Sequence, residues 1–287
     1  MANSFGGPWT AKKLELLEAY LHFYATALKN QNFTLHYVDA FAGTGAVSPR
    51  RLEGDEFLIP PEDLEGSVSR ALAVEPGFHY YHFNDLDQQH SAKLRELEAL
   101  HPGRNIHIYQ QDANDFVREI CSRLKSRDRA VMFLDPFSSE LEWATLEVVA
   151  ASGKVDLWLL FPFLTLLRIT PRDGGKIRDE WRNAANRLLG TDDWEQWLYQ
   201  PEEQNPTPDL FAEESSCRGS ERSRADDVAK SITRRLQDIF PYVAEPVHLR
   251  NRGRPLFLFY FAVSNPNPAA QGLAKRVVDD IRRKNAK

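Results

Sequence analysis

The stretch YVDAFAGTG, residues Tyr37 to Gly45, gives the strongest indication of the fold. It overlaps a short apolar run, Phe33 to Ala40, that has the length and composition of a buried strand. The strand ends in Asp39, and a turn with Gly43 and Gly45 follows at once. Glycines in such a turn let main-chain N–H groups approach a ligand closely, because glycine adopts backbone angles barred to other residues. Strand, acid and Gly-x-Gly turn together predict a nucleotide-type site, and the absence of Lys-Ser or Lys-Thr after the glycines excludes a Walker-type phosphate loop.

The chain on either side of this stretch alternates between two hydrophobic periods. Before it, apolar residues at steps of three and four predict an amphipathic helix with Thr10 as N-cap: Leu14, Leu17, Leu21, Tyr24 and Leu28. After it, strand-like runs at 79–84, 105–109, 130–134 and 155–161 alternate with helix-like segments at about 88–100, 114–125 and 142–151. This alternation predicts βαβ units and a parallel sheet, with ligands at the carboxyl ends of the strands.

The regular alternation ends after Phe163. Residues 165–225 hold helix-like pieces and then a Pro-, Glu- and Ser-rich stretch that is typical of an exposed loop. We therefore predict a single domain over residues 1–287 with a helical and loop insertion at 165–225. The remaining chain predicts a helix, an antiparallel hairpin of two strands and a final helix, at 226–239, 242–249 with 256–263, and 269–284.

Acids follow the next two strands as well. Asp85 lies about forty residues beyond the glycine turn, where an acid can bind the two ribose hydroxyls of a nucleoside. Asp87 suits the N-cap of the helix that follows. After the third strand, Asp112 is a candidate acceptor for the exocyclic amine of adenine, and we interpret Asn114 as a helix cap. Because the carboxyl ends of parallel strands share one edge of a sheet, we expect these acids to lie near one another.

The fourth strand ends in FLDPF, residues 133–137. An acid exposed at a strand end, held rigid by a proline and followed by an aromatic residue, suits an amino nucleophile. The Asp135 carboxylate and the Pro136 carbonyl would hold the N–H groups, and the Phe137 ring would stack on a base. The alternative interpretation is a proline-containing turn from strand to loop, with the phenylalanine in the core.

Several motifs resemble the three-Cys-motif partner protein family (TcmP) over essentially the whole chain: YVDAFAGTG, YHFNDLD, VMFLDPF, RPLFLFYFAVSNPNP and the N-terminal KLELLEAYLHFYATALKN. The resemblance implies a class I methyltransferase-like Rossmann fold, S-adenosylmethionine as cofactor, and a partner protein of radical-SAM type that carries three cysteines. Members of that family commonly continue the Asp-Pro-Phe motif with glycine, whereas Ser138 and Ser139 follow here. This difference bears on the catalytic residues and not on the cofactor.

The leading hypothesis is an S-adenosylmethionine-dependent methyltransferase that acts on an exocyclic amine of nucleic acid. Its cofactor-binding residues would be Asp39, Phe41, Ala42, Gly43, Gly45, Asp85, Asp112 and Ala113. Its acceptor would be positioned by Asp135, Pro136 and Phe137. The alternative is a catalytically silent module of the same fold that binds the partner protein or nucleic acid. A nicotinamide dehydrogenase is disfavoured, because the turn lacks the third glycine of the dinucleotide fingerprint.

The net charge of −5 conceals an asymmetry along the chain. Residues 211–287 carry 15 Lys and Arg against 9 Asp and Glu, whereas residues 1–210 carry 21 against 32. A basic C-terminal part favours a polyanionic partner, since phosphate contacts dominate nucleic-acid affinity. Arg250, Arg252 and Arg254 in the hairpin turn are the residues that we expect at phosphates. Ordinary solvated surfaces remain the alternative.

Composition limits the remaining classes. No stretch approaches the roughly 20 apolar residues that span a bilayer, and the N-terminus has no apolar signal core, so we expect a cytoplasmic protein. Cys121 and Cys217 are too few for a disulfide scaffold or an internal zinc or iron–sulfur site. We expect no metal, and we interpret His79, His82 and His90 as packing or surface residues. Aromatic residues at 181, 194, 197 and 199 are expected to close a small core rather than to stack on bases.

Overall fold

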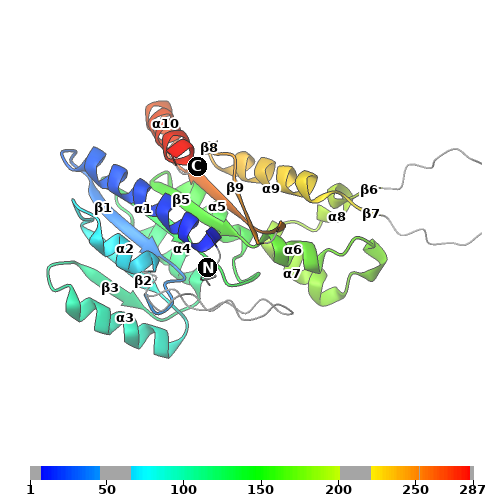
Figure 1. The fold of residues 1–287 in the computed structure, drawn as a ribbon, viewed down its shortest axis with the longest axis horizontal. Coiled ribbons are helices and arrows are strands. Elements are labelled where there is room, and N and C mark those ends of the chain that lie inside the picture. The colour runs from blue at the N-terminus through cyan, green and yellow to red at the C-terminus, as the bar shows by residue number, and fades with distance from the viewer. Residues whose placement is uncertain (1–7, 46–65, 201–220, 252, 285–287) are drawn as a thin grey trace, which may run out of the picture.

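A computed structural model describes residues 8–45, 66–200, 221–251 and 253–284. Its main sheet has the strand order β3-β2-β1-β4-β5-β10-β8, and β9 also pairs with β10 (Figure 1). The first five strands are all parallel: β1 (Thr34–Asp39), β2 (Tyr80–Asn84), β3 (Ile106–Tyr109), β4 (Asp128–Leu134) and β5 (Val155–Phe161). The predicted Rossmann-like α/β fold with a mostly parallel sheet is confirmed.

The C-terminal strands run against the others. β10 (Arg254–Val263) is antiparallel to β5, and β9 (Val247–Asn251) and β8 (Tyr242–Val243) are antiparallel to β10. The predicted hairpin is present, although its first strand is interrupted at 244–246, where Pro246 lacks the N–H that a ladder needs. Leu258 pairs with Phe161, the last residue of β5. The tip of the hairpin therefore extends past the carboxyl edge of the parallel strands.

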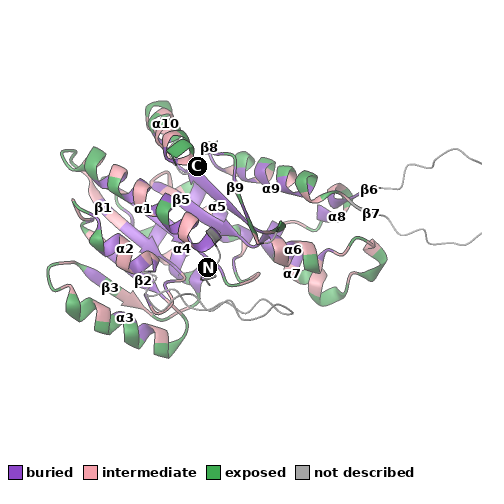
Figure 2. Ribbon diagram, in the orientation of Figure 1, coloured by how far each residue is buried: buried purple, intermediate pink, exposed green. Residues whose placement is uncertain are grey.

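Helices cover both faces of the sheet, and each face has its own hydrophobic cluster. On one face lie α1 (Pro8–Leu28), α2 (Ser67–Ala73), α3 (Gln88–Leu100) and α10 (Pro268–Lys284). On the other face lie α4 (Ala113–Arg123), α5 (Trp143–Ser152) and α9 (Ala225–Ile239). Because side chains alternate along a strand, Leu35 and Tyr37 of β1 join the first cluster and Val38 joins the second. Figure 2 shows the resulting buried layer along the strands.

The segment after β5 consists of short elements: α6 (Phe163–Ile169), a 3-10 turn (Gly174–Lys176), α7 (Asp179–Leu189), α8 (Trp194–Leu198), β6 (Tyr199–Gln200) and β7 (Glu221–Arg222). Trp194 and Tyr199 belong to the same hydrophobic cluster as α4 and α5, so the core interpretation of these two rings is confirmed. Trp197 packs against that cluster, and Trp181 is half-buried beneath Arg178. Most of the expected loop stretch falls at 201–220, outside the described residues. The boundaries of the insertion stay a prediction.

Two expectations about helices differ from the structure. α1 begins at Pro8, so Thr10 lies inside the helix and is buried, and it is not the N-cap. The periodicity of the leucines located the helix but not its first turn, where Trp9 packs against Phe257. α2 was not expected, because its seven residues are too few to display a helical period. In the described part of the chain, no helix is both long enough and apolar enough to cross a bilayer.

Candidate active site

The glycine turn after β1 is tied to the end of β2. Gly43 and Gly45 have φ values of 61° and 81°, in the left-handed region that favours glycine. The Gly43 N–H donates to Asp85 Oδ2 at 2.9 Å, and the Ala42 N–H donates to the Asn84 carbonyl at 2.9 Å. A Cβ added at Gly45 would lie 3.1 Å from the Leu97 side chain of α3. The conformation of the turn and its close packing therefore both favour glycine.

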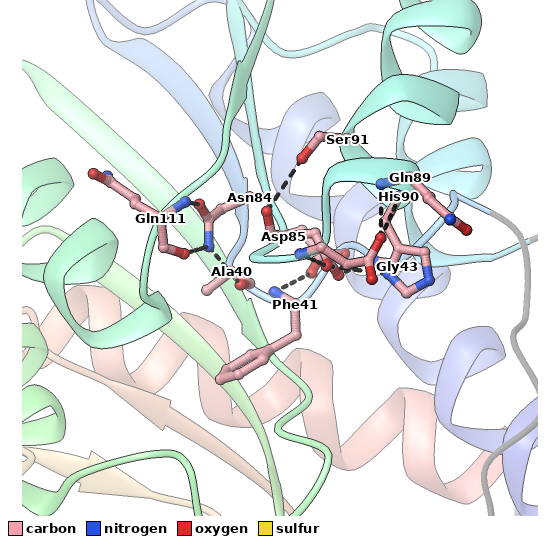
Figure 3. A network of polar contacts seen from close by, with 11 residues as sticks. Ala40, Phe41, Gly43, Asn84, Asp85, Gln89, His90, Ser91 and Gln111 are labelled. Atoms are coloured by element: carbon pink, nitrogen blue, oxygen red, sulfur yellow. Dashed lines mark hydrogen bonds and ion pairs between the residues drawn. The ribbon is translucent and has the colours of Figure 1, made fainter.

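Asn84, which no sequence motif singled out, joins the ends of three strands. Its side chain is buried, and its Nδ2 donates to the carbonyls of Ala40 and Gln111 at 3.2 and 3.0 Å. Its Oδ1 accepts from the Gln111 N–H at 3.1 Å. The Asn84 amide group thus connects the end of β2 to the residue after β1 and to the turn after β3 (Figure 3). The available signal was an amide residue at the end of a strand of aromatic residues, in the FND sequence.

Asp85 is the first residue after β2 and accepts three hydrogen bonds at this edge. Besides the Gly43 contact, its Oδ1 accepts from the Asp87 N–H at 2.9 Å and lies 3.1 Å from His90 Nδ1 (Figure 3). Its side chain is 17% exposed. A carboxylate oxygen accepts about two hydrogen bonds, so Oδ2 keeps capacity for a hydroxyl of a ligand.

Asp39 is placed differently from our expectation. It is 0% exposed, its Oδ1 accepts from the Phe41 N–H at 3.2 Å, and its Oδ2 accepts from the Ser67 hydroxyl of α2 at 2.6 Å. Burial raises the pKa of Asp39 to about 7. Asp39 therefore acts on any ligand through the turn that it shapes, since its side chain is fully buried. The Phe41 ring is directed away from Asp85 and His90 (Figure 3).

Asp112 is the N-cap of α4, and the interpretation of Asn114 as a cap is wrong. Asp112 Oδ1 accepts from the Asn114 and Asp115 N–H groups at 2.8 and 3.3 Å. Both residue types make good caps, and the helix begins one residue earlier than its apolar period indicated. Asp112 is exposed, and no hydrogen bond within the described chain reaches its Oδ2, which is therefore open to a ligand amine. Ala113 is buried beneath it.

Asn114 instead connects α4 to the segment that follows β4. Its Nδ2 donates to the Glu140 carbonyl, and its Oδ1 accepts from the Glu142 N–H and the Thr145 hydroxyl, each at 2.9 Å. The cap expected at Asp87 is confirmed, since its carboxylate accepts from the N–H groups of Gln89 and His90.

Asp135 lies just beyond β4, where we expected an exposed acid, but it is only 9% exposed. Lys13 of α1 donates to Asp135 Oδ2 at 2.5 Å. The Lys13 ammonium also lies 5.7 Å from the Trp9 ring centroid and 5.8 Å from that of Phe133. This lysine was missed, although it had a signal: four residues after Trp9 and four before Leu17, it lies on the apolar face of α1.

The two residues after Asp135 differ in exposure. Pro136 is buried, whereas the Phe137 side chain is 54% exposed, so the alternative of a core phenylalanine is wrong. The Phe137 N–H donates to Glu140 Oε2 at 2.9 Å, which closes the turn containing Ser138 and Ser139. An exposed ring thus lies beside a buried ion pair.

The basic hairpin tip lies at the same edge of the sheet. Arg250 and Arg254 are exposed, and Arg252 is outside the described residues. Phe257, near the start of β10, packs on Trp9 of α1 with ring centroids 5.2 Å apart. Because Trp9 also contacts Lys13, the structure brings this part of the hairpin next to the ion pair of Asp135.

Several histidine side chains and the Cys121 thiol have structural surroundings. Rings of His36, His82 and His107 stack across β1, β2 and β3 at 5.3 and 5.4 Å. Burial lowers the pKa of His82 to about 3, so its ring is neutral. Burial raises the pKa of the Cys121 thiol to about 12. Among the described residues, no group of three or more His, Cys, Asp or Glu could hold a metal ion.

Comparisons with known proteins bear on the fold alone. A scan against protein-family models finds no match, and a search of curated proteins also finds none. Among solved structures, protein LPL1258 from Legionella pneumophila matches with a TM-score of 0.52 and 11% identity, over 96% of this chain and 92% of that chain.

Two looser matches are the magnesium protoporphyrin IX methyltransferase ChlM from Synechocystis and the N-terminal domain of EvdMO1, both with bound SAH. Their TM-scores are 0.39 and 0.38, and their identities are 13% and 14%. The match with ChlM covers 92% of this chain and 89% of that chain, and the match with EvdMO1 covers 86% of this chain and 80% of that chain. Likeness at this level does not indicate what this chain binds, and membership of the TcmP family stays a prediction.

Proposed function

We propose that this chain is an S-adenosylmethionine-dependent methyltransferase whose acceptor is an exocyclic amine of nucleic acid. One observation carries the proposal. The ends of the first four strands bring a glycine turn fastened to Asp85, an open Asp112 carboxylate and the Lys13–Asp135 pair to one edge of the sheet. In an open α/β sheet, ligands bind outside the carboxyl ends of the strands.

The residues at this edge fit the proposed cofactor. The turn from Phe41 to Gly45 would hold its methionine end, with Asp39 fixing the backbone. Asp85 would accept from the ribose hydroxyls through the remaining capacity of Oδ2, and Asp112 would accept from the adenine amine. S-adenosylmethionine supplies, when bound, a methyl group on a positively charged sulfur.

The chain's own contribution to the chemistry is alignment and charge. An aromatic amine has its lone pair delocalised into the ring, and a carboxylate that accepts from its N–H favours the pyramidal geometry in which the lone pair is freed. Asp135 would be that acceptor. Lys13 fixes the direction of the Asp135 carboxylate and compensates its charge. The exposed Phe137 ring would stack on the base that carries the amine.

The nucleic-acid acceptor is supported by the position of the hairpin. Arg250 and Arg254 are exposed at the edge that carries Asp135 and Phe137, so a phosphate backbone bound there would lie next to the acceptor site. We further propose the TcmP-type partner, a radical-SAM-type protein with three cysteines, on the motif resemblance alone.

A silent binding module is the second candidate, and one observation favours it. The carboxylate that should hold the acceptor amine already forms a buried ion pair with Lys13. An enzyme must share this carboxylate between Lys13 and the substrate, whereas a module that only binds nucleic acid or a partner needs no such sharing.

The test combines cofactor binding with methyl transfer from labelled S-adenosylmethionine to separate pools of RNA, DNA and protein. The wild type should bind the cofactor and label a nucleic-acid pool. Asp85→Ala should weaken cofactor binding by about 1–3 kcal/mol, the cost of removing a charged hydrogen-bond partner. Asp135→Ala should lower the single-turnover rate by roughly a hundredfold or more and leave cofactor affinity nearly unchanged.

Asp87→Ala is the matched control, because Asp87 neighbours Asp85 and its carboxylate caps α3. It should retain both affinity and rate. A folded wild type that binds no cofactor would refute the proposal. Binding without transfer to any pool would select the silent module, and label on protein alone would overturn the choice of acceptor.

A further inference from the structure

A cavity lies at the edge of the sheet opposite the candidate active site, between the C-terminal half of α1 and the first turns of α10. Its volume is about 230 Å³. The amino ends of β4 and β5 and the start of α10 complete its lining: Tyr20, Phe23, Tyr24, Ala27, Leu28, Phe33, Arg129, Lys154, Asp156, Asn265, Asn267, Ala270, Leu273 and Ala274. None of these residues belongs to the candidate active site.

The walls of the cavity suit a flat ring. Four aromatic side chains line it, from Tyr20, Phe23, Tyr24 and Phe33, and Leu273 at the α10 side is 39% exposed. A cavity of about 150 Å³ accommodates benzene, so this larger space has room for a bicyclic base. Ligand pockets are commonly apolar, with a few polar groups that fix the orientation of the ligand.

Asp156, the second residue of β5, supplies an acceptor inside the cavity. The Tyr20 hydroxyl donates to its Oδ2 at 2.5 Å, and within the described chain no hydrogen bond reaches Oδ1. Burial raises the pKa of Asp156 to about 6, so the carboxylate is mostly ionised at neutral pH. Asp156 is partly buried and lines the cavity, so its Oδ1 is open to the N–H groups of a ligand.

Two cations also line the cavity. The Arg129 guanidinium lies 4.3 Å from the Phe33 ring centroid, and its Nη1 donates to the Ser126 and Asp128 carbonyls. The Lys154 ammonium donates to the Leu124 carbonyl at 3.0 Å and retains two further N–H donors. With Asp156 ionised, the lining carries one net positive charge, which favours a ligand with an anionic group.

We propose that this cavity binds a guanine nucleotide, with the base among the aromatic side chains and the phosphate at Lys154 and Arg129. Guanine presents two adjacent N–H donors, at N1 and the exocyclic amine, and a carboxylate accepts such a pair through its two oxygens. Adenine offers one donor beside an acceptor, which would face the carboxylate unfavourably. The aromatic walls, the carboxylate and the two cations together favour a guanine nucleotide over a purely apolar ligand.

This site is independent of the proposed methyltransferase activity. Tyr20 and Lys13 both belong to α1, but they are seven residues apart, or about 10 Å along the helix axis. They meet acids at opposite edges of the sheet. A nucleotide bound at Asp156 should therefore not compete with a ligand at Asp85.

Titration calorimetry on the full chain tests the proposal with guanosine 5′-monophosphate, inosine 5′-monophosphate and inorganic phosphate as probes. The guanine nucleotide should bind at least tenfold more tightly than the inosine nucleotide, which lacks the exocyclic amine, and phosphate alone should bind weakest. Asp156→Asn should weaken guanine nucleotide binding at least tenfold. Leu273→Trp, at a partly exposed position, should block the cavity without requiring any change in the core.

Asp85→Ala is the control and should bind the guanine nucleotide as the wild type does. Equal affinity for the guanine and inosine nucleotides would overturn the proposed base recognition. Binding that Asp85→Ala abolishes but Leu273→Trp leaves intact would place the nucleotide at the other edge of the sheet and overturn the site. Failure of the folded wild type to bind any nucleotide at millimolar concentration would refute the proposal outright.

Discussion

The two edges of the parallel sheet each hold an acid that is partnered by α1, buried at the carboxyl edge and partly buried at the amino edge, but the partners differ. At the carboxyl edge Asp135 meets the ammonium group of Lys13, whereas at the amino edge Asp156 meets the neutral hydroxyl of Tyr20. The carboxyl edge is further organised by main-chain N–H groups, which donate to Asp39, Asp85 and Asp112. The amino edge is walled by aromatic side chains.

The difference indicates two kinds of site. Main-chain donors and glycine turns hold acids in fixed directions, which suits a reaction that depends on alignment. Aromatic walls with a single acceptor suit recognition of a flat ligand. Because α1 contributes a partner to the acid at each edge, substitutions along α1 test the two edges separately.

The largest expected effect comes from removing the two partners in turn. Lys13→Met removes the ammonium partner of the buried Asp135 carboxylate, which should lower the free energy of unfolding by about 3–5 kcal/mol. Tyr20→Phe removes one hydrogen bond to Asp156 and should cost about 1–3 kcal/mol. Urea unfolding at neutral pH measures both. Equal losses would contradict the distinction between an ion pair and a hydrogen bond, and Lys13→Met combined with Asp135→Leu should recover part of the loss.

The buried acids should also set the pH dependence of stability. The pKa values of Asp39 and Asp156 are raised to about 7 and about 6 from 3.8 by burial. A raised carboxyl pKa means that the folded state binds the proton more tightly, so this stability is present below pH 3.8 and is lost as the pH rises through the folded value. The loss amounts to at most about 4 kcal/mol for Asp39 and about 3 kcal/mol for Asp156.

Unfolding experiments at half-unit steps from pH 4 to 8 measure these contributions. Asp39→Asn should flatten the decline up to about pH 7, and Asp156→Asn should flatten only the part below about pH 6. If both variants show the same pH dependence of stability as the wild type, neither acid has a raised pKa in the folded protein.

A smaller effect separates capping from ligand binding. Asp112 and Asp87 both cap a helix by accepting two main-chain N–H groups. Replacing either with alanine should cost about 1 kcal/mol of stability. Only Asp112→Ala should also weaken S-adenosylmethionine binding, because its Oδ2 is open at the carboxyl edge. Calorimetry beside thermal melts tests this pair, and equal cofactor affinity in both variants would reduce Asp112 to a cap.

The smallest expected effect concerns the hairpin tip. Arg250→Gln with Arg254→Gln should flatten the dependence of nucleic-acid affinity on salt concentration by roughly one unit for each phosphate that is no longer neutralised. Arg95→Gln with Arg276→Gln, which changes two exposed arginines on other helices, is the control and should leave the slope unchanged. If the two double variants behave alike, the hairpin arginines are solvated surface residues.

Much of the fold was predictable because its signals are local. β5 and α3 have the expected bounds, and the other strands and helices of the parallel part, apart from the unexpected α2, begin or end within a few residues of the expected positions. Alternation of strand and helix was sufficient for this result, since a parallel pair requires a crossover. Asn114 shows the limit: two adjacent capping residues have the same local preference, and the packing of α4 against α5 decided between them.

The sequence by itself determined the order of the elements, the glycine turn, and the acids that follow successive strands, because each depends on neighbours within a few residues. The tertiary structure was needed to find the contacts between distant residues. Lys13 donates to Asp135, 122 positions away in the sequence, and Tyr20 donates to Asp156, 136 positions away. The Asn84 amide connects the ends of three strands. The tertiary structure also placed Asp135, which we expected to be exposed, in a buried position. The physical reason is that partners far apart in sequence are selected by the packing of α1 and the sheet, which no local pattern encodes.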